Sequence, residues 1–268
     1  MSNLGIAFEV LKPGDKALSG WKKASGHLIY DVKMDFTPKS RWLKEGHWTP
    51  NPKTSCYAGV VSRESIRIAL TYATLHKIDV KAADIQNAYL QAPSSEKYFI
   101  YCSEESRLEH VGSVVLIRVA LYGRKAAGRD LWHHLHSCME HLQFKSIRAD
   151  PDVWIWPARR KDGTKYYEYV LLYTDYCPVI SDNAEKILRN EIGKYFRLNE
   201  KSIGGPGKYL GEKLRKVELN NGIDCWEFSS TQYLQYAVKN VEQHLKVKGK
   251  KLLAKAPAPF QNHYRPDG

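Results

Sequence analysis

The order of the hydrophobic patterns along this chain of 268 residues constrains its fold more than any other feature. Strand-like and helix-like segments follow one another irregularly, and two pairs of strand-like segments are joined by the turn sequences Lys161-Asp162-Gly163 and Asn220-Asn221-Gly222. Turns of this kind join neighbouring antiparallel strands. A doubly wound fold would instead require strands and helices in regular alternation. The sequence therefore predicts an α+β fold built on an antiparallel sheet.

Local patterns place the individual elements. Strands are expected where β-branched and aromatic residues cluster or alternate with polar ones, at Leu28 to Phe36, Ile78 to Asp84, Tyr98 to Cys102, Val114 to Leu121, Val153 to Trp156, Tyr166 to Thr174, Cys177 to Ser181, Tyr209 to Leu219 and Ile223 to Phe228. Helices are expected where apolar residues recur at helical spacing, from Ser62 to about His76, from about Ala126 to Leu142, from Asp182 through Phe196 and from Ser229 to Leu245. Ser62 is the expected cap of the first helix, and Asp182 with Glu185 resembles a capping box at the third.

The chain is strongly basic. Lys and Arg number 41 against 29 Asp and Glu, which gives a formal net charge of +12. Such an excess favours a polyanionic partner, and nucleic acid is the first to consider, because binding releases the counterions that nucleic acids condense. Solvated surface lysines would give the same composition. Charge alone leaves both interpretations open.

Cysteine usage and hydropathy bear on the compartment. The five cysteines are scattered, odd in number and never spaced as C-x-x-C, so neither a disulfide framework nor a zinc site is predicted. No basic-then-apolar leader opens the sequence, and the longest apolar runs, such as Val170 to Tyr173, are too short to span a bilayer. We expect a protein of the cytoplasm or nucleus, with no membrane contact.

Two aspartates form the constellation of greatest chemical interest. Asp84 ends a predicted strand, and Asp175 lies in a tight connection between two predicted strands, in Tyr173-Thr-Asp175-Tyr176. A lone Asp at a strand end is more often a turn former or helix cap. Two carboxylates on neighbouring strands are, however, what phosphoryl transfer requires to hold Mg²⁺. Together they form a candidate metal site.

Several segments in order resemble copia-type retrotransposon reverse transcriptases. DIQNAYL, which begins at Asp84, resembles the family's D-V-K-T-A-F-L, and LYGRKAAGRDLW, from Leu121 to Trp132, resembles L-Y-G-L-K-Q-A-P-R-A-W. YTDY resembles the Y-x-D-D turn, KSRWLKEG from Lys39 resembles K-A-R-L-V-A-K-G, and SSTQYLQYAV resembles S-Q-x-x-Y-I. The resemblance covers nearly the whole chain.

The resemblance implies a right-hand polymerase fold. It would comprise one reverse transcriptase domain over residues 1–250, followed by an extended tail over 251–268. Fingers would occupy about 1–78 and 93–122, an antiparallel palm about 79–92 and 123–228, and the start of a thumb about 229–250. The implied reaction is DNA synthesis from deoxynucleoside triphosphates on a primed RNA or DNA template.

The resemblance also implies roles for individual residues. Asp84 and Asp175 would be the catalytic ligands of Mg²⁺. Tyr89 would be the aromatic gate that excludes a ribose 2′-OH, although a core tyrosine is the plainer interpretation. Lys39 and Arg41 would bind the triphosphate, where fixed cations lower the barrier to transfer, although solvated surface charges are the plainer interpretation for them.

The chain departs from the family at the turn. Tyr176 replaces the second Asp, and a neutral phenol is a poor ligand for Mg²⁺. A missing carboxylate worth about 4 to 7 kcal/mol in the transition state would slow the reaction on the order of 10³- to 10⁵-fold. Pro178, two residues on, cannot donate a hydrogen bond within the strand that completes the hairpin. Ala126 and Gly128 also replace the family's Gln and Pro.

The sequence thus predicts a reverse transcriptase domain by descent with weak or no polymerase activity. One alternative is a basic nucleic-acid-binding protein that retains the fold without catalysis. Another is a domesticated protein that uses the fold as a protein-interaction scaffold.

Overall fold

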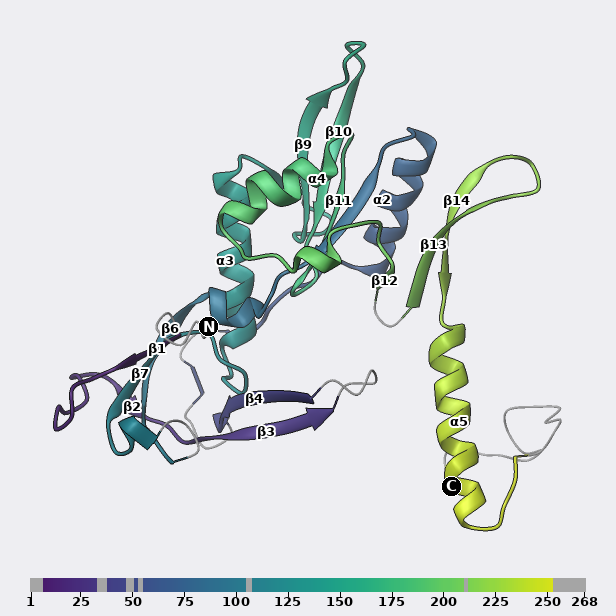
Figure 1. The fold of residues 1–268 in the computed structure, drawn as a ribbon. Coiled ribbons are helices and arrows are strands. Elements are labelled where there is room, and N and C mark those ends of the chain that lie inside the picture. The colour runs from purple at the N-terminus through teal and green to yellow at the C-terminus, as the bar shows by residue number, and fades with distance from the viewer. Residues whose placement is uncertain are drawn as a thin grey trace, which may run out of the picture. The chain divides into compact units, whose positions relative to one another are not determined.

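The computed structural model describes residues 7–32, 38–46, 51–52, 55–104, 108–209 and 212–252. The chain forms two compact units, residues 1–206 and 207–268. Both contain helices and strands, which confirms the predicted α+β class (Figure 1).

A five-stranded antiparallel sheet forms the centre of the first unit, in the order β5-β11-β10-β9-β8. Its strands are β5 (Val80–Asp84), β8 (Lys145–Ser146), β9 (Val153–Arg159), β10 (Lys165–Leu171) and β11 (Tyr176–Ile180). The predicted turn Lys161-Asp162-Gly163 joins β9 to β10, and Gly163 supplies the positive φ of 86° that the turn requires. The hairpin predicted from sequence is confirmed.

Helices cover both faces of this sheet. One face packs against α3 (Ala127–His141) and a helical run over residues 184–194, which bury a shared apolar core that includes Leu131, Met139, Val170 and Leu188. The other face packs against α2 (Arg63–Leu75), whose Tyr72 ring lies 5.1 Å from Tyr169. Figure 1 shows α3 and α2 on opposite sides of the strands. The sheet is therefore the middle of three layers.

The helix ends agree with the sequence in one case and differ in another. The Ser62 side chain accepts a hydrogen bond from the Ser65 N–H and so caps α2 as expected. The third expected helix is instead three short pieces, α4 (Ala184–Lys186), a π-helix (Ile187–Glu191) and a 3₁₀ turn (Ile192–Lys194). The capping box at Asp182 was wrong, because Asn183 is the N-cap and the Asp182 carboxylate pairs with Arg160 Nε at 3.0 Å.

A second sheet in this unit has the order β1-β7-β6-β2. Its strands are β1 (Phe8–Val10), β2 (Lys22–Lys23), β6 (Pro93–Tyr101) and β7 (Val114–Val119), and β2 runs parallel to β6. The hairpin of β3 (Gly26–Val32) and β4 (Pro38–Lys44) is separate. The part of the predicted strand that extends over residues 33–36 lies outside the described residues.

Strand β4 meets the turn before α3 through backbone contact. The Lys44 N–H donates to the Tyr122 carbonyl at 3.0 Å, and Gly123 has a positive φ of 83°. A Cβ at Gly123 would overlap the Lys44 carbonyl oxygen, and a Cβ at Gly46 would overlap the Gly123 carbonyl oxygen. Only glycine at both positions allows the two backbones to approach so closely.

The second unit consists of a three-stranded sheet and a helix. Strands β12 (Lys208–Tyr209), β13 (Glu212–Glu218) and β14 (Asp224–Ser229) precede α5 (Thr231–Val247). The predicted turn Asn220-Asn221-Gly222 joins β13 to β14, with Gly222 at φ 76°. Both the hairpin and the helix agree with the sequence prediction.

Candidate functional site

Asp84 is held at the end of β5 by backbone hydrogen bonds to a distant segment. Its N–H donates to Ser202 Oγ at 2.8 Å, and its carbonyl oxygen accepts from the Asn199 N–H at 2.8 Å. These bonds occupy the main chain and leave the carboxylate exposed at the strand end. The segment around residues 199–202 thus fixes where Asp84 stands.

Asp175 lies in a two-residue turn between β10 and β11. The Tyr173 and Tyr176 backbones exchange hydrogen bonds of 3.0 and 2.8 Å, which closes the turn over Thr174 and Asp175. Thr174 has a φ of 52°, a left-handed conformation that is costly for a β-branched residue. The predicted tight connection is present, with backbone strain at its tip.

The turn meets β5 directly, so the two aspartates are neighbours. The Ile85 N–H donates to the Asp175 carbonyl oxygen at 2.6 Å, and Tyr176 pairs with Asp84 in the register of β5 and β11. Tyr176, where the family's second Asp would stand, is therefore directly opposite Asp84. The structure brings all three positions to one edge of the sheet.

The carboxylates of Asp84 and Asp175 repel one another at this edge. Partial burial raises the pKa of the Asp84 carboxyl above its ordinary value, and the nearby Asp175 charge raises it further. Among the described residues, neither carboxylate forms an ion pair with a Lys or Arg side chain. A cation bound between these two carboxylates would relieve the repulsion between them.

Aromatic rings border the carboxylates. Tyr89 lies in a 3₁₀ turn (Ala88–Gln91), and its ring centroid is 4.9 Å from that of Tyr122. Burial and the Asp175 charge raise the pKa of both phenols, so both stay protonated at neutral pH. Tyr89 is half-buried against the core of the first unit. Its placement is compatible with a core role and with a role at the site.

The two predicted basic residues differ in their surroundings. The Arg41 guanidinium lies 5.6 Å from the Tyr122 ring centroid, which connects it through aromatic contacts to Tyr89. Lys39 lies opposite Asp31 in the register of β3 and β4, and no described contact joins Lys39 to Asp84 or Asp175. The structure brings Arg41 to the border of the site and leaves Lys39 on the hairpin.

Pro178 interrupts the ladder without opening the turn. Strands β10 and β11 pair at Val170 and Val179, and the same register returns at Tyr173 and Tyr176, on either side of an unpaired stretch that contains Pro178. A proline has no N–H to donate there. The expected local defect is real, and its effect is confined to the middle of the hairpin.

The metal-binding capacity of the site rests on two carboxylates. No group of three or more His, Cys, Asp or Glu side chains that could hold a metal occurs in the part of the chain that the structure describes. Asp84 and Asp175 nevertheless supply the oxygen ligands that Mg²⁺ prefers, with Tyr176 in place of a third. The donor set fits one ion better than two.

Several residues at or near this edge were not singled out from the sequence. Tyr122 belongs to the segment Leu121-Tyr122-Gly123, but a tyrosine at this position does not by itself predict a functional role. Ser202 and Asn199 reach Asp84 from more than 100 residues away. Elsewhere in the first unit, Lys44 and Arg124 are both buried, which nothing in their local sequence predicts.

These features define an α+β protein with a pair of aspartates at the ends of neighbouring strands. No protein-family model matches the chain. Over 184 residues it is 25% identical to the Retrovirus-related Pol polyprotein from transposon TNT 1-94 of Nicotiana tabacum. The match covers 67% of this chain, which spans only 13% of the polyprotein. The similarity indicates a retrotransposon origin.

Within the described ranges, every helix is too short or too polar to cross a bilayer.

Proposed function

We propose that this chain is a copia-type reverse transcriptase domain with weak or no remaining polymerase activity. The ancestral reaction would be templated DNA synthesis by transfer of nucleotidyl groups from deoxynucleoside triphosphates. The observation that carries the proposal is the meeting of Asp84, Asp175 and Tyr176 at one sheet edge. The similarity to a Pol polyprotein supports it independently.

In this proposal the central sheet is the palm. The segments about 1–78 and 93–122 would be fingers, and about 229–250 the start of a thumb. Asp84 and Asp175 would hold Mg²⁺, which when bound would neutralise charge on the transferred phosphate. Arg41 and Lys39 would attract the triphosphate, and Tyr89 would limit space beside the sugar.

The decisive experiment restores the missing carboxylate. Tyr176→Asp places a carboxylate opposite Asp84, and we expect Mg²⁺-dependent primer extension to rise by roughly 10³- to 10⁵-fold, the effect of one ion-coordinating group. The matched control carries the same change with Asp84→Asn and should show no gain. A gain of similar size in both backgrounds would disprove the role of this site.

Pro178 provides a second arm of the experiment. If Tyr176→Asp alone gives no extension, Pro178→Leu in the same protein restores the missing N–H and the pairing of β10 with β11. If the double variant folds and binds duplex, yet makes no DNA, the carboxylate loss is not the main defect. The region of Ala126 or the fingers would then have to be compromised.

The sugar gate has its own test in any active variant. Tyr89→Ala should admit ribonucleotides, because the ring that would clash with a 2′-OH is gone. Misincorporation is measured with each ribonucleotide in turn. Unchanged discrimination in a folded, active variant would return Tyr89 to a core role.

A basic nucleic-acid-binding protein without catalysis is the second candidate function. The net charge of +12 favours it, since it requires no intact metal site. It predicts duplex binding that weakens steeply with salt, with no extension in any variant. A protein-interaction scaffold, the remaining candidate, predicts no salt-dependent binding of nucleic acid.

A further inference from the structure

The segment over residues 197–204 runs beside β5 and completes the sheet edge at which Asp84 stands. It forms antiparallel bridges to Ile85 and to Ala82, on either side of Asp84. Its hydrogen bonds to the main chain of Asp84 lie between these two bridges. The position of the carboxylate edge therefore depends on a segment that is far away in sequence.

The Gln91 side chain joins this segment to the 3₁₀ turn that carries Tyr89. Its Nε2 donates to the Arg197 carbonyl at 3.0 Å and to the Gln86 carbonyl at 2.6 Å, and its Oε1 accepts from the Arg197 N–H at 2.7 Å. The Arg197 carbonyl also accepts from the Gln86 N–H at 2.9 Å. Both N–H donors and the oxygen of one amide are thus used to hold the main chain.

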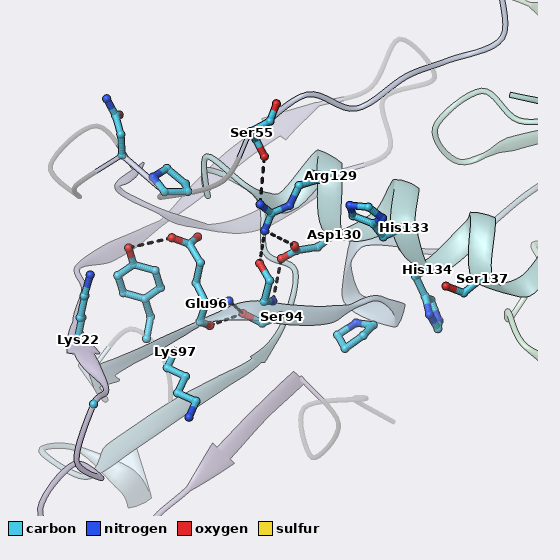
Figure 2. A pocket seen from close by; sticks show the side chains of 16 residues that line it. Lys22, Ser55, Ser94, Glu96, Lys97, Arg129, Asp130, His133, His134 and Ser137 are labelled. Atoms are coloured by element: carbon cyan, nitrogen blue, oxygen red, sulfur yellow. Dashed lines mark hydrogen bonds and ion pairs between the residues drawn. The ribbon is translucent and has the colours of Figure 1, made fainter. Parts of the chain in front are cut away.

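The other side of the same turn is anchored independently. The turn leads directly into β6, where the Ser95 N–H donates to Asp130 Oδ2 at 3.1 Å and Ser95 Oγ accepts from Arg129 at 2.6 Å. Figure 2 shows Arg129 and Asp130 of α3 facing this strand. Among the described residues, no side chain of the turn other than Gln91 hydrogen-bonds to the segment 197–204. The exit of the turn is therefore fixed to α3, and its approach to the aspartate edge is fixed by Gln91.

We propose that Gln91 is a positioning residue, which holds the Tyr89 ring and the Asp84 strand end at a set distance through the main chain of Arg197. This role rests on the proposed function, in which Asp84 holds Mg²⁺ and Tyr89 limits the space beside the sugar. A ring excludes a 2′-OH only while it stays fixed relative to the reacting phosphate, and a shift of about 1 Å is enough to weaken such a site. Gln91 would set both properties without touching metal or nucleotide.

Two glutamines of the same stretch provide matched variants. Gln91→Met keeps the length of the side chain and removes its three hydrogen bonds. Gln86→Met is the control, because the Gln86 side chain is exposed and forms no described hydrogen bond, while its main chain still pairs with Gln91. Gln91→Glu keeps an acceptor for the Arg197 N–H but turns its second oxygen toward two carbonyl oxygens. It should behave like Gln91→Met.

The first measurement is Mn²⁺ binding, with Mn²⁺ as a spectroscopic substitute for Mg²⁺. Gln91→Met should weaken the binding roughly threefold to tenfold, at or below the lower end of what loss of a group that contacts a metal ligand costs. Gln86→Met should bind Mn²⁺ like the unaltered protein. Asp84→Asn shows how much of the binding belongs to the site.

The outcomes of this titration separate the two proposals. An Asp84-dependent site that Gln91→Met leaves unchanged would overturn the role of Gln91 alone. Equal losses in Gln91→Met and Gln86→Met would do the same. If Asp84→Asn bound Mn²⁺ as tightly as the unaltered protein, the proposed function and the role of Gln91 would both be overturned.

The second measurement is sugar discrimination in the Tyr176→Asp protein, as the ratio of kcat/KM for a deoxynucleotide to that for its ribonucleotide. Gln91→Met should lower this ratio roughly tenfold. It should add little in a Tyr89→Ala background, because both changes act through the same ring. A merely structural role would lower both rates alike and leave the ratio unchanged. An unchanged ratio, or a further tenfold fall beside Tyr89→Ala, would overturn the role of Gln91. If the Tyr176→Asp protein makes no DNA, the Mn²⁺ titration decides alone.

Discussion

The two pairs of carboxylates in the first unit are treated in opposite ways. Asp130 is buried and Glu96 is partly buried, and both contact the guanidinium of Arg124. Asp84 and Asp175 stand at a sheet edge, repel one another and form no ion pair among the described residues. The contacts with Arg124 lower the free-energy cost of burying the charges of Glu96 and Asp130. The free-energy cost of ionising Asp84 beside Asp175 stays high, because no described cation offsets it. A carboxylate pair maintained at a cost is what a cation site requires.

The largest loss of stability should come from removing Arg124, the cation that Glu96 and Asp130 share. Arg124→Met leaves Glu96 and Asp130 without their shared buried cation, and we expect a loss of about 3 to 5 kcal/mol in the free energy of unfolding. Denaturant titration measures it. The control is Arg118→Met, which breaks an exposed pair with Glu9 and should cost no more than about 1 kcal/mol. Similar losses in both would show that burial of Arg124 contributes nothing.

The next effect concerns Lys44, a buried cation beside the same cluster. Its lowered pKa means that the folded protein loses this proton near pH 8 while the unfolded chain keeps it to about pH 10.5, so stability rises with pH across that interval. Lys44→Met should stabilise the protein at pH 7 by on the order of 2 to 3 kcal/mol. The gain should shrink between pH 8 and 10.5. A variant less stable at pH 7 would contradict this account.

A smaller effect is expected at the strained turn. Thr174→Asn replaces a β-branched residue at φ 52° with one that tolerates this conformation, and should stabilise the protein by about 1 kcal/mol. Thermal unfolding measures the change. Thr164→Asn in the neighbouring hairpin, where φ is not positive, should alter stability by less than about 0.5 kcal/mol. Equal effects would exclude strain at the carboxylate edge.

The smallest effect tests the repulsion itself. Because the Asp84 pKa is raised, its ionisation destabilises the fold, and stability falls as pH rises through the range of its titration. Asp84→Asn should therefore gain a few tenths of a kcal/mol at pH 7 and no advantage in acid. The Asp162 carboxylate, whose pKa hydrogen bonds from Thr164 lower, provides the reverse case, since Asp162→Asn should destabilise at pH 7. If both substitutions changed stability at pH 7 in the same direction, the contrast between the two carboxylates would be refuted.

Short-range features of this structure could be predicted from sequence. The Ser62 cap, the Asn220-Asn221-Gly222 hairpin and the turn around Asp175 each depend on residues within a few positions. Their contacts form locally, so the local pattern contains the necessary information. The meeting of Asp84 with the Asp175 turn followed from the family resemblance and from the expectation that the two strands are neighbours.

Long-range features could not be predicted. The parallel pairing of β2 with β6 joins residues more than 70 positions apart, and two residues of β2 give no periodic signal. The break of the third helix into α, π and 3₁₀ turns depends on its packing against the sheet, which overrides local propensity. Burial of Lys44 and Arg124 likewise depends on their neighbours in space.

The glycine contact between β4 and the turn before α3 has a consequence for the history of the gene. Gly46 and Gly123 lie on segments far apart in sequence, yet a side chain at either would push the two segments apart. Most changes in the first two bases of a glycine codon introduce such a side chain. Any such mutation would break this contact, so selection for the fold opposes it. Both glycines are intact, as expected of a coding sequence that was selected for its fold through most of its past.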